Sequence, residues 1–272
     1  MLRQRRAIAP GLIAAFVLAA TASAQPSSVF DAVLPEANAA APNISTNALK
    51  AALAEGRALL LDTRPHMEWA VSHIPRARNV APKPGMAMAA YTSDVREIER
   101  LTGGNRAQPL IVYCNGPFCG KSSRVAEDLV KAGYRDVRRY QLGAPVWRAL
   151  GNPMVIEPDG AAHVHRLDRT AVWIDARAPG GRAAVAGSRS IPQSGLKPGR
   201  DEGVIGEAKN DGRLPMEDHN TRIIVFGENA AQARAVADAI AQAAFHNVTY
   251  FEGTAEALGA AIAGGPRRTP TN

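Results

Sequence analysis

The sequence predicts an α/β protein built from two similar units, each a mainly parallel β-sheet flanked by helices. Two observations lead to this fold class. Short apolar segments typical of buried strands alternate with amphipathic segments typical of helices, which is the order of βαβ units. The same order then occurs a second time further along the chain, as expected of an internal repeat. We therefore expect a duplicated fold with parallel strands.

The first copy begins with a helix that starts at Ser45 or Thr46, because a hydroxyl residue is a favourable N-cap, and that ends at Gly56. The elements that follow alternate in type. They are a buried strand at 59–64, a second buried strand at 110–114, an amphipathic helix at 122–131 that Gly133 terminates, and a third strand at 137–140.

The second copy repeats these landmarks at a constant offset. Asp175 lies 113 residues after Asp62, and Gly227 lies 113 residues after Cys114. Equal offsets at two separate positions favour a duplication over chance. The matching elements are strands at 172–177 and 223–227, a helix at 230–243 and a strand at 247–251.

The first residues have the three-part order of a secretory signal peptide. A cationic start with Arg3, Arg5 and Arg6 precedes an apolar stretch at 7–20, and the small residues at 22–24 form a cleavage site before Gln25. The apolar stretch is shorter than the roughly 20 residues of a membrane-spanning helix. We expect an exported, periplasmic protein without a membrane span in the mature chain.

The predicted organisation follows from the repeat and from runs of turn-forming residues. Gly151, Pro153, Pro158, Asp159 and Gly160 indicate a linker between the copies. The expected segments are a signal peptide at 1–24, a leader at 25–44, an active domain at 45–155, a linker at 156–168, an inactive domain at 169–262 and a tail at 263–272.

Composition excludes several classes of protein. The chain has 272 residues, of which 46% are hydrophobic and 21% charged, as in ordinary globular proteins. Removal of the three N-terminal arginines lowers the formal net charge from +7 to +4, which is too small a bias for a nucleic-acid-binding surface. Two cysteines exclude a disulfide scaffold.

Cys114 is the main candidate for a functional residue. It follows a predicted parallel strand and precedes a predicted helix, where ligand sites of open α/β sheets form. Backbone N–H groups of the loop and the helix N-terminus favour an anion there, and therefore a thiolate or a persulfide. Such a cysteine can accept the outer sulfur of a donor and pass it to a thiophilic acceptor.

Four segments resemble the rhodanese (sulfurtransferase) superfamily. Residues 60–69 are similar to the first strand of that family and its turn, and residues 72–79 (SHIPRARN) are similar to its Gly-His-Ile-Pro-Gly-Ala-x-Asn signature. Tyr113 and Cys114 match the position of its catalytic cysteine, and residues 142–147 resemble its closing Gly-Gly-x-x-x-Trp element. The resemblance covers about residues 45–155 and, more weakly, 165–262.

The resemblance implies a sulfurtransferase that uses Cys114 as its catalytic residue and needs no cofactor. The expected donor is thiosulfate, a persulfide or mercaptopyruvate, and the expected acceptor is a thiol or cyanide. A periplasmic thiol reductant is a further expected partner. The loop that would bind the substrate contains Asn115, Gly116, Pro117, Phe118, Cys119, Gly120 and Lys121.

The loop departs from the family pattern in ways that bear on the donor. Its glycine, Gly116, comes one place early, Pro117 follows it, and Cys119 stands where a basic or hydroxyl residue is common. Lys121 is the nearest cation, so a persulfide or polysulfide donor suits the loop at least as well as the doubly charged thiosulfate. Gly120 stands where a Cys-x5-Arg phosphatase needs arginine, which argues against that activity.

Other polar residues receive structural interpretations. Asp62 and Arg64 could act as acid and base, but we expect a supporting pair that holds the strand end and the neighbouring loop. His163 and His165 could hold a metal ion on a strand face. Without a third ligand nearby, we expect a solvated pair in the linker and no metal site.

Three functions remain open. The first is sulfur transfer through a Cys114 persulfide, the second a thiol–disulfide or sensing protein that uses Cys114 with Cys119, and the third a non-enzymatic binding module. Cys119 is expected at the start of the helix, where it modulates Cys114, and the distance between the two is not fixed by the sequence. The second copy is expected to be silent, because Gly227 replaces the cysteine and Glu228 adds negative charge.

Overall fold

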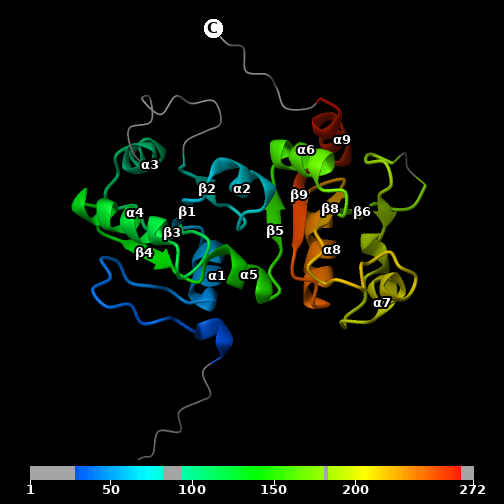
Figure 1. Cartoon of the computed structure of the whole chain (residues 1–272), viewed down its shortest axis with the longest axis horizontal. Helices are drawn as coiled ribbons and strands as arrows, with labels where there is room; N and C mark the ends of the chain where they lie inside the picture. The colour runs from blue at the N-terminus through cyan, green and yellow to red at the C-terminus, as the bar shows by residue number, and fades with distance from the viewer. Residues whose placement is uncertain (1–27, 82–93, 181–182, 265–272) are drawn as a thin grey trace, which may run out of the picture.

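The structure is a computed structural model that describes residues 28–81, 94–180 and 183–264. Two parallel sheets form its framework (Figure 1). The predicted signal peptide and most of the predicted tail lie outside the described residues.

The first sheet has the strand order β2-β1-β3-β4, and all its pairs are parallel. Its strands are β1 (Leu59–Asp62), β2 (Arg78–Asn79), β3 (Leu110–Tyr113) and β4 (Val137–Tyr140). Runs of buried aliphatic side chains form β1 and β3 at the centre, as the sequence predicts. In the register, Asp62 lies beside Tyr113, so the polar end of β1 is next to the end of β3.

Helices cover both faces of this sheet. Apolar side chains of α3 (Asp94–Thr102) and α4 (Gly120–Lys131) share one core cluster with the sheet, and those of α1 (Thr46–Glu55) and α5 (Gly143–Ala149) share another. The predicted caps of α1 are present, with the Ser45 hydroxyl accepting from the N–H of Ala48 and Gly56 in the left-handed conformation. A shorter helix, α2 (His66–Val71), follows β1.

The second sheet has the order β5-β9-β8-β6-β7 and is also parallel throughout. Its strands are β5 (Met154–Ile156), β6 (Val172–Asp175), β7 (Arg189–Ser190), β8 (Ile223–Gly227) and β9 (Val248–Thr254). Its helices are α6 (Pro158–Leu167), α7 (Gly203–Asn210), α8 (Ala230–Gln242) and α9 (Ala255–Gly264). Two short 3-10 helices, Val29–Asp31 and Gln193–Gly195, complete the described elements.

The second sheet repeats the first, with β7-β6-β8-β9 in the places of β2-β1-β3-β4. Helices repeat as well, because α7 and α8 pack on one face and α6 and α9 on the other. Strand β5 extends the second sheet beyond β9. In the first sheet this edge is taken by Asn43, which forms a parallel bridge with Arg139 of β4.

Residues 156–168, predicted to be a linker, form a regular part of the second sheet's layers. Helix α6 occupies most of the segment, and Ala161 and Val164 are buried in the core with Trp173. The proline and acidic residue that suggest a turn are instead favourable helix-start residues, with Pro158 in the first turn and Asp159 near the positive end of the helix. Helix α6 follows β5 as α1 follows the Asn43 bridge.

The two sheets are joined through backbone contacts. His73 and Val155 exchange two hydrogen bonds in an antiparallel bridge, at 3.0 and 2.8 Å, which connects the segment after α2 to β5. The N–H of Glu157 donates to the carbonyl of Ala70 at 2.7 Å, so the start of α6 contacts α2 directly. In Figure 1, α2 and α6 lie next to each other near the top of β5.

Candidate functional site

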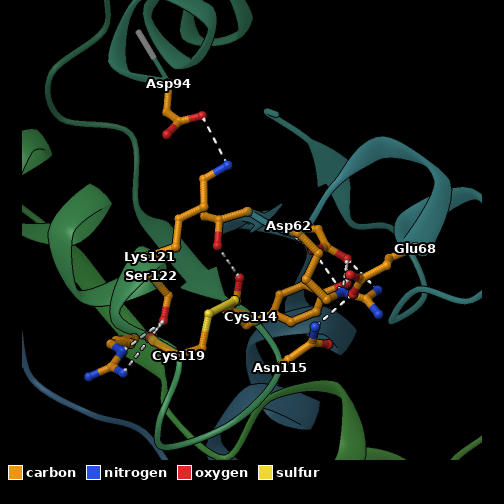
Figure 2. The surroundings of a disulfide bond; sticks show 12 residues. Asp62, Glu68, Asp94, Cys114, Asn115, Cys119, Lys121 and Ser122 are labelled. Carbon is orange, nitrogen blue, oxygen red and sulfur yellow. Dashed lines mark hydrogen bonds and ion pairs between the residues drawn. A yellow bond between two sulfur atoms is a disulfide. The ribbon is translucent and has the colours of Figure 1, made fainter. Parts of the chain in front are cut away.

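Cys114 and Cys119 form a disulfide at the carboxyl end of β3 (Figure 2). Cys114 follows the strand directly, and Cys119 is the N-cap residue of α4. Their Cα atoms are 6.2 Å apart, within the range that a disulfide requires. The distance between Cys114 and Cys119, which the sequence did not determine, is therefore short enough for a disulfide. The two cysteines belong to one site.

The two cysteines differ in exposure. Cys114 is 4% exposed, whereas Cys119 is only partly buried, and its side chain makes no capping hydrogen bond to α4. Between them, Gly116 is buried and the ring of Phe118 is fully exposed. A turn in which the N–H of Cys119 donates to the carbonyl of Gly116, at 3.1 Å, places Phe118 at the tip of the loop.

The start of α5 holds the loop in place. Gly143 has a φ of +66°, and a Cβ atom there would lie 2.3 Å from the carbonyl oxygen of Cys114 and 2.4 Å from the nitrogen of Gly116. The N–H of Ala144 donates to the same Cys114 carbonyl at 3.0 Å. Only glycine fits this left-handed position against the loop, which explains the glycine of the segment 142–147.

Arg139 of β4 is a buried cation beside the loop and is not among the site residues predicted from the sequence. Its side chain is 3% exposed, and Nε donates to the hydroxyl of Ser122 at 3.0 Å while Nη2 donates to the carbonyl of Cys119 at 3.4 Å. Strand alternation offered a signal, because Arg138 and Arg139 point to opposite faces of β4 and helices are expected on both faces of the sheet.

Glu36, from the predicted leader, neutralises this arginine. Its Oε2 accepts from Nη1 of Arg139 at 2.5 Å and from the amides of Asn43 and Gln141, each at 3.1 Å. The end of the segment 28–44 thus packs on the first sheet, with Ala41 in the core. A carboxylate 78 positions before Cys114 in the chain therefore contributes to the charge near the disulfide.

The rim of the loop holds the remaining residues that the sequence assigned to the site. Asn115 is exposed and donates to Oε2 of Glu68 at 2.6 Å, and Nζ of Lys121 lies 3.9 Å from Oδ1 of Asp94 (Figure 2). Pro117 is partly buried, and Gly120 is exposed in the first turn of α4. The predicted loop residues are therefore contiguous around the disulfide.

Asp62 and Arg64 form a buried ion pair at the end of β1, beside Tyr113 of β3. Nη2 of Arg64 lies 2.6 Å from Oδ2 of Asp62 and 2.6 Å from the carbonyl of Ser72, and the hydroxyl of Tyr113 donates to Asp62 at 2.5 Å. Burial by itself lowers the pKa of Arg64, but Asp62 outweighs it and holds the pKa above its usual range. Burial, and then the Asp62 charge, raise the pKa of Tyr113.

The second sheet contains the same pair without the cysteine. Asp175 and Arg177 form an ion pair at 2.8 Å, and Arg177 also reaches Glu256 at 3.2 Å. Gly227 ends β8, and its loop differs from the first, because the Gln232 side chain accepts from the N–H of Glu228 at 2.8 Å beside it. The Asp-x-Arg pair is thus present in the second sheet, where no cysteine follows the central strand. This fits a structural role for Asp62 and Arg64 in supporting the strand end.

The loop after β8 is also shorter than the loop after β3. Leu110 and Ile223 are 113 positions apart, whereas the helix starts Gly120 and Ala230 are 110 positions apart. The loop after β8 therefore has three residues fewer than the loop that carries Cys114, Phe118 and Cys119.

His163 and His165 lie on helix α6, not on a strand or in an irregular linker, and the His165 ring contacts Trp173 edge-on at 5.8 Å. Across the described ranges, no group of three or more histidine, cysteine or acidic residues is placed to hold a metal ion. No helix within those ranges is long and apolar enough to cross a membrane.

Fold and site together define an α/β protein with a cysteine-bearing loop at the carboxyl edge of a parallel sheet. Residues 45–150 match the model of the rhodanese-like domain, and this part of the chain is a rhodanese-like domain. The match covers the first sheet, its helices and both cysteines.

Comparison with individual proteins adds a partial relative. An HTH-type transcriptional regulator of Mycobacterium tuberculosis is 33% identical over 102 residues, which are 36% of this chain and 38% of the regulator. The chain thus matches well under half the length of that curated relative.

Solved structures that match part of the chain include wild-type EanB, with a TM-score of 0.38 and 14% identity over 78% of this chain and 58% of EanB. A thiosulfate sulfurtransferase from Pseudomonas aeruginosa has a TM-score of 0.33 and 22% identity over 80% of this chain and 42% of that enzyme.

Proposed function

We propose that the chain is a sulfurtransferase in which Cys114 carries sulfane sulfur as a persulfide and Cys119 resolves that persulfide. The observation that supports this most is the position of the two cysteines in a rhodanese-like domain, within disulfide distance at the end of β3. A strand-end cysteine before a helix N-terminus is placed to react as a thiolate, and a second cysteine in reach can displace what the first one holds.

The proposed reaction has two steps. The Cys114 thiolate attacks the outer sulfur of a donor R–S–SH, so that a bond forms between Cys114 and that sulfur while R–S⁻ leaves. An acceptor thiolate then takes the outer sulfur, and Cys114 leaves as a thiolate.

When no acceptor binds, the Cys119 thiolate attacks Sγ of Cys114 in the persulfide. The Cys114–Cys119 disulfide forms and HS⁻ leaves, so that two cysteines are oxidised and the sulfane sulfur is reduced. The chain then stays in the disulfide form until a reductant reduces the Cys114–Cys119 disulfide.

Charges near the loop favour a persulfide donor over thiosulfate. Arg139 is paired with Glu36, and Lys121 faces Asp94, so both cations already have a carboxylate nearby. A donor with two negative charges would have to compete with these carboxylates, whereas a persulfide carries at most one charge at its reacting sulfur.

Intact-mass spectrometry of the reduced chain tests the assignment of the sulfur carrier. Glutathione persulfide should first add the mass of one sulfur to the wild-type chain, before Cys119 releases that sulfur, and should leave Cys114→Ser unmodified. Thiosulfate should modify a smaller fraction of the wild-type chain. A sulfur adduct on Cys114→Ser together with its loss from Cys119→Ser would move the nucleophile to Cys119.

The disulfide itself favours a second candidate, a thiol–disulfide redox or sensing protein. Such a protein would cycle between dithiol and disulfide without taking up sulfur. A measurable Cys114–Cys119 reduction potential, together with no sulfur adduct from any of the donors, would select this function over sulfur transfer.

We also propose that the protein works in the periplasm. The signal-peptide pattern of residues 1–24 supports export, and a disulfide persists in an oxidising compartment. Signal-peptide cleavage and periplasmic recovery of the tagged chain test this proposal.

A further inference from the structure

Reopening of the Cys114–Cys119 disulfide is a chemical step that the site must allow, whichever of the two functions holds. A disulfide is opened by a thiolate that attacks one of the two sulfurs, and access decides which sulfur is attacked. The two sulfurs of this site do not offer equal access, because Cys114 is 4% exposed at the end of a central strand and Cys119 is partly exposed.

Cys114 is also fixed by its surroundings. Its carbonyl accepts from Ala144, Gly143 packs against the backbone of its loop, and β3 lies between β1 and β4. Cys119 stands at the start of α4, where its side chain caps nothing. An incoming thiolate therefore meets Cys119 first, and Cys114 is the leaving group.

Phe118 precedes Cys119 at the tip of the loop and is fully exposed. The other large apolar side chains with high exposure in the described ranges are valines, leucines and one methionine, between 41% and 61% exposed. Phe118 is thus the one aromatic ring in those ranges that is displayed to solvent in this way. An aromatic ring buries a large apolar area when a partner covers it, and aromatic residues are frequent anchors of interfaces.

The neighbouring residues favour an uncharged contact surface. From Asn115 to Gly120 the loop carries no charged side chain. A small thiol is too small to cover the ring of Phe118, whereas a protein that presents its thiol within an apolar surface covers the ring and reaches Cys119 in one encounter.

We propose that Phe118 and Cys119 form the docking and attack point of a protein dithiol that reduces this chain. The first thiolate of the partner attacks Sγ of Cys119, so that a partner–Cys119 disulfide forms and Cys114 leaves as a thiolate. The second thiol of the partner, after losing its proton, attacks the partner sulfur in that bond and releases the Cys119 thiolate. The partner ends as a disulfide, and the two electrons pass to Cys114 and Cys119.

This inference rests on the disulfide and not on sulfur transfer. A chain that takes up no sulfur but is reduced through Phe118 would contradict the proposed function alone. A chain that forms the Cys114 persulfide but is reduced without regard to Phe118 would contradict the docking proposal alone.

Reduction kinetics of the oxidised chain test the docking surface. The probe is reduced thioredoxin, a protein dithiol, compared with dithiothreitol, a small dithiol. Phe118→Ser should slow reduction by thioredoxin about tenfold, the effect of losing one aromatic anchor, and leave reduction by dithiothreitol unchanged. The matched control, Val130→Ser, removes an exposed apolar side chain that is 42% exposed on α4 and should change neither rate. Equal rates for Phe118→Ser and the wild type with thioredoxin, or no reduction by thioredoxin of a disulfide that dithiothreitol opens, would overturn the proposal.

A trapping experiment tests the attacked sulfur. A thioredoxin variant that keeps only its attacking cysteine is mixed with the oxidised chain, and free thiols are alkylated at once. Both cysteines lie in the tryptic peptide 107–121, so fragmentation of that peptide locates the bond. We expect thioredoxin on Cys119 and the alkyl group on Cys114, and the reverse assignment would overturn the proposal.

Discussion

Beside the disulfide, the Arg139 guanidinium connects three segments that are distant in sequence, namely its own strand β4, the start of α4 and the segment 28–44. It donates to the Cys119 carbonyl, to the Ser122 hydroxyl and to the Glu36 carboxylate. A cation with 3% exposure is stable there because the Glu36 carboxylate balances its charge and each donating nitrogen has an acceptor. The geometry of the loop thus depends on a segment that precedes the rhodanese-like domain.

Replacing the carboxylate should therefore destabilise the fold. In Glu36→Gln the buried Arg139 loses its counter-charge, so the free energy of unfolding in urea should fall by about 1–3 kcal/mol. The matched control is Glu55→Gln, which removes the partner of the exposed Arg57 and should change the free energy by less than about 0.5 kcal/mol. Equal effects of the two substitutions would show that Arg139 does not depend on Glu36.

His73 gives the protein a pH-dependent stability. It is 3% exposed, its Nδ1 lies 3.0 Å from the Trp69 carbonyl, and its Nε2 lies 3.7 Å from Glu157. Burial, partly offset by the Trp69 carbonyl and the Asp62 charge, lowers the pKa of His73 to about 4.

Because the pKa is lower in the folded state than in the unfolded chain, His73 stabilises the fold above about pH 6.5, and this contribution is lost as the pH falls towards 4. Relative to His73→Gln, the wild type should lose about 3 kcal/mol of unfolding free energy over that range. Urea titrations at several pH values measure the difference, and His163→Gln on α6 serves as the control. Burial raises the pKa of Glu157, so the contribution of that carboxyl to stability changes with pH in the opposite direction. It does so in both the wild type and His73→Gln. Parallel pH profiles for the wild type and His73→Gln would refute the prediction.

Much of the site follows from local sequence, and part of it does not. Cys114, Cys119 and the loop between them are contiguous, so strand and helix signals on either side are enough to locate them. Arg139 and Glu36 reach the loop only after the chain has folded, since β4 and the segment 28–44 come from other parts of the sequence. No local pattern brings the two side chains together.

At the scale of elements, the predicted strands were placed correctly where runs of leucine, isoleucine and valine are uninterrupted. Strands β1, β3 and β8 are examples, and the helix start at Ser45 agrees as well, whereas α4 begins at Gly120, two residues before the predicted start. The prediction differed from the structure at α6, where proline, aspartate and glycine start a helix instead of forming a linker. Tertiary packing stabilises a helix there, because α6 packs against α2 and places Ala161 and Val164 in the core of the second sheet.

Gly160 makes the close contact between α2 and α6 possible. A Cβ atom there would lie 2.0 Å from the Ala70 carbonyl oxygen, which is backbone and cannot move aside cheaply. Gly160→Ala should lower the unfolding free energy by about 1–3 kcal/mol, as overpacking does, despite the higher helix propensity of alanine. Gly264→Ala is the control, because a Cβ atom at that position would have no neighbouring atom within 4 Å, and it should not destabilise the protein. Thermal or urea unfolding measures both, and an unchanged Gly160→Ala would mean that α2 and α6 are not packed this closely.

At the scale of the whole molecule, the structure repeats one arrangement of strands and helices and keeps the cysteine loop in the first copy alone. Strand β5 and α6 belong to the second sheet, since β5 pairs with β9 and α6 shares the core of Trp173, Phe226 and Leu258. The second sheet therefore extends to residues before Arg169, and we expect the boundary between the two copies to lie near Gly151.

Two fragments test where the second copy begins. A fragment of residues 152–272 contains β5 and α6 and should show a cooperative thermal transition. A fragment of residues 169–272 lacks the edge strand and a core helix, so it should lose that transition. Circular dichroism melting curves measure both. Equal cooperativity in the two fragments would place β5 and α6 outside the folding unit.

The proposed roles of Cys114 and Cys119 can be tested by time-resolved intact-mass spectrometry of the reduced chain with one equivalent of glutathione persulfide. The wild type should first gain the mass of one sulfur and then convert to the disulfide form as sulfide is released. Cys119→Ser should gain the sulfur and keep it, because no resolving thiolate is present, and Cys114→Ser should gain none. A wild-type chain that reaches the disulfide form without a sulfur adduct, or a Cys119→Ser chain that loses its sulfur as fast as the wild type, would contradict the assigned roles of the two cysteines.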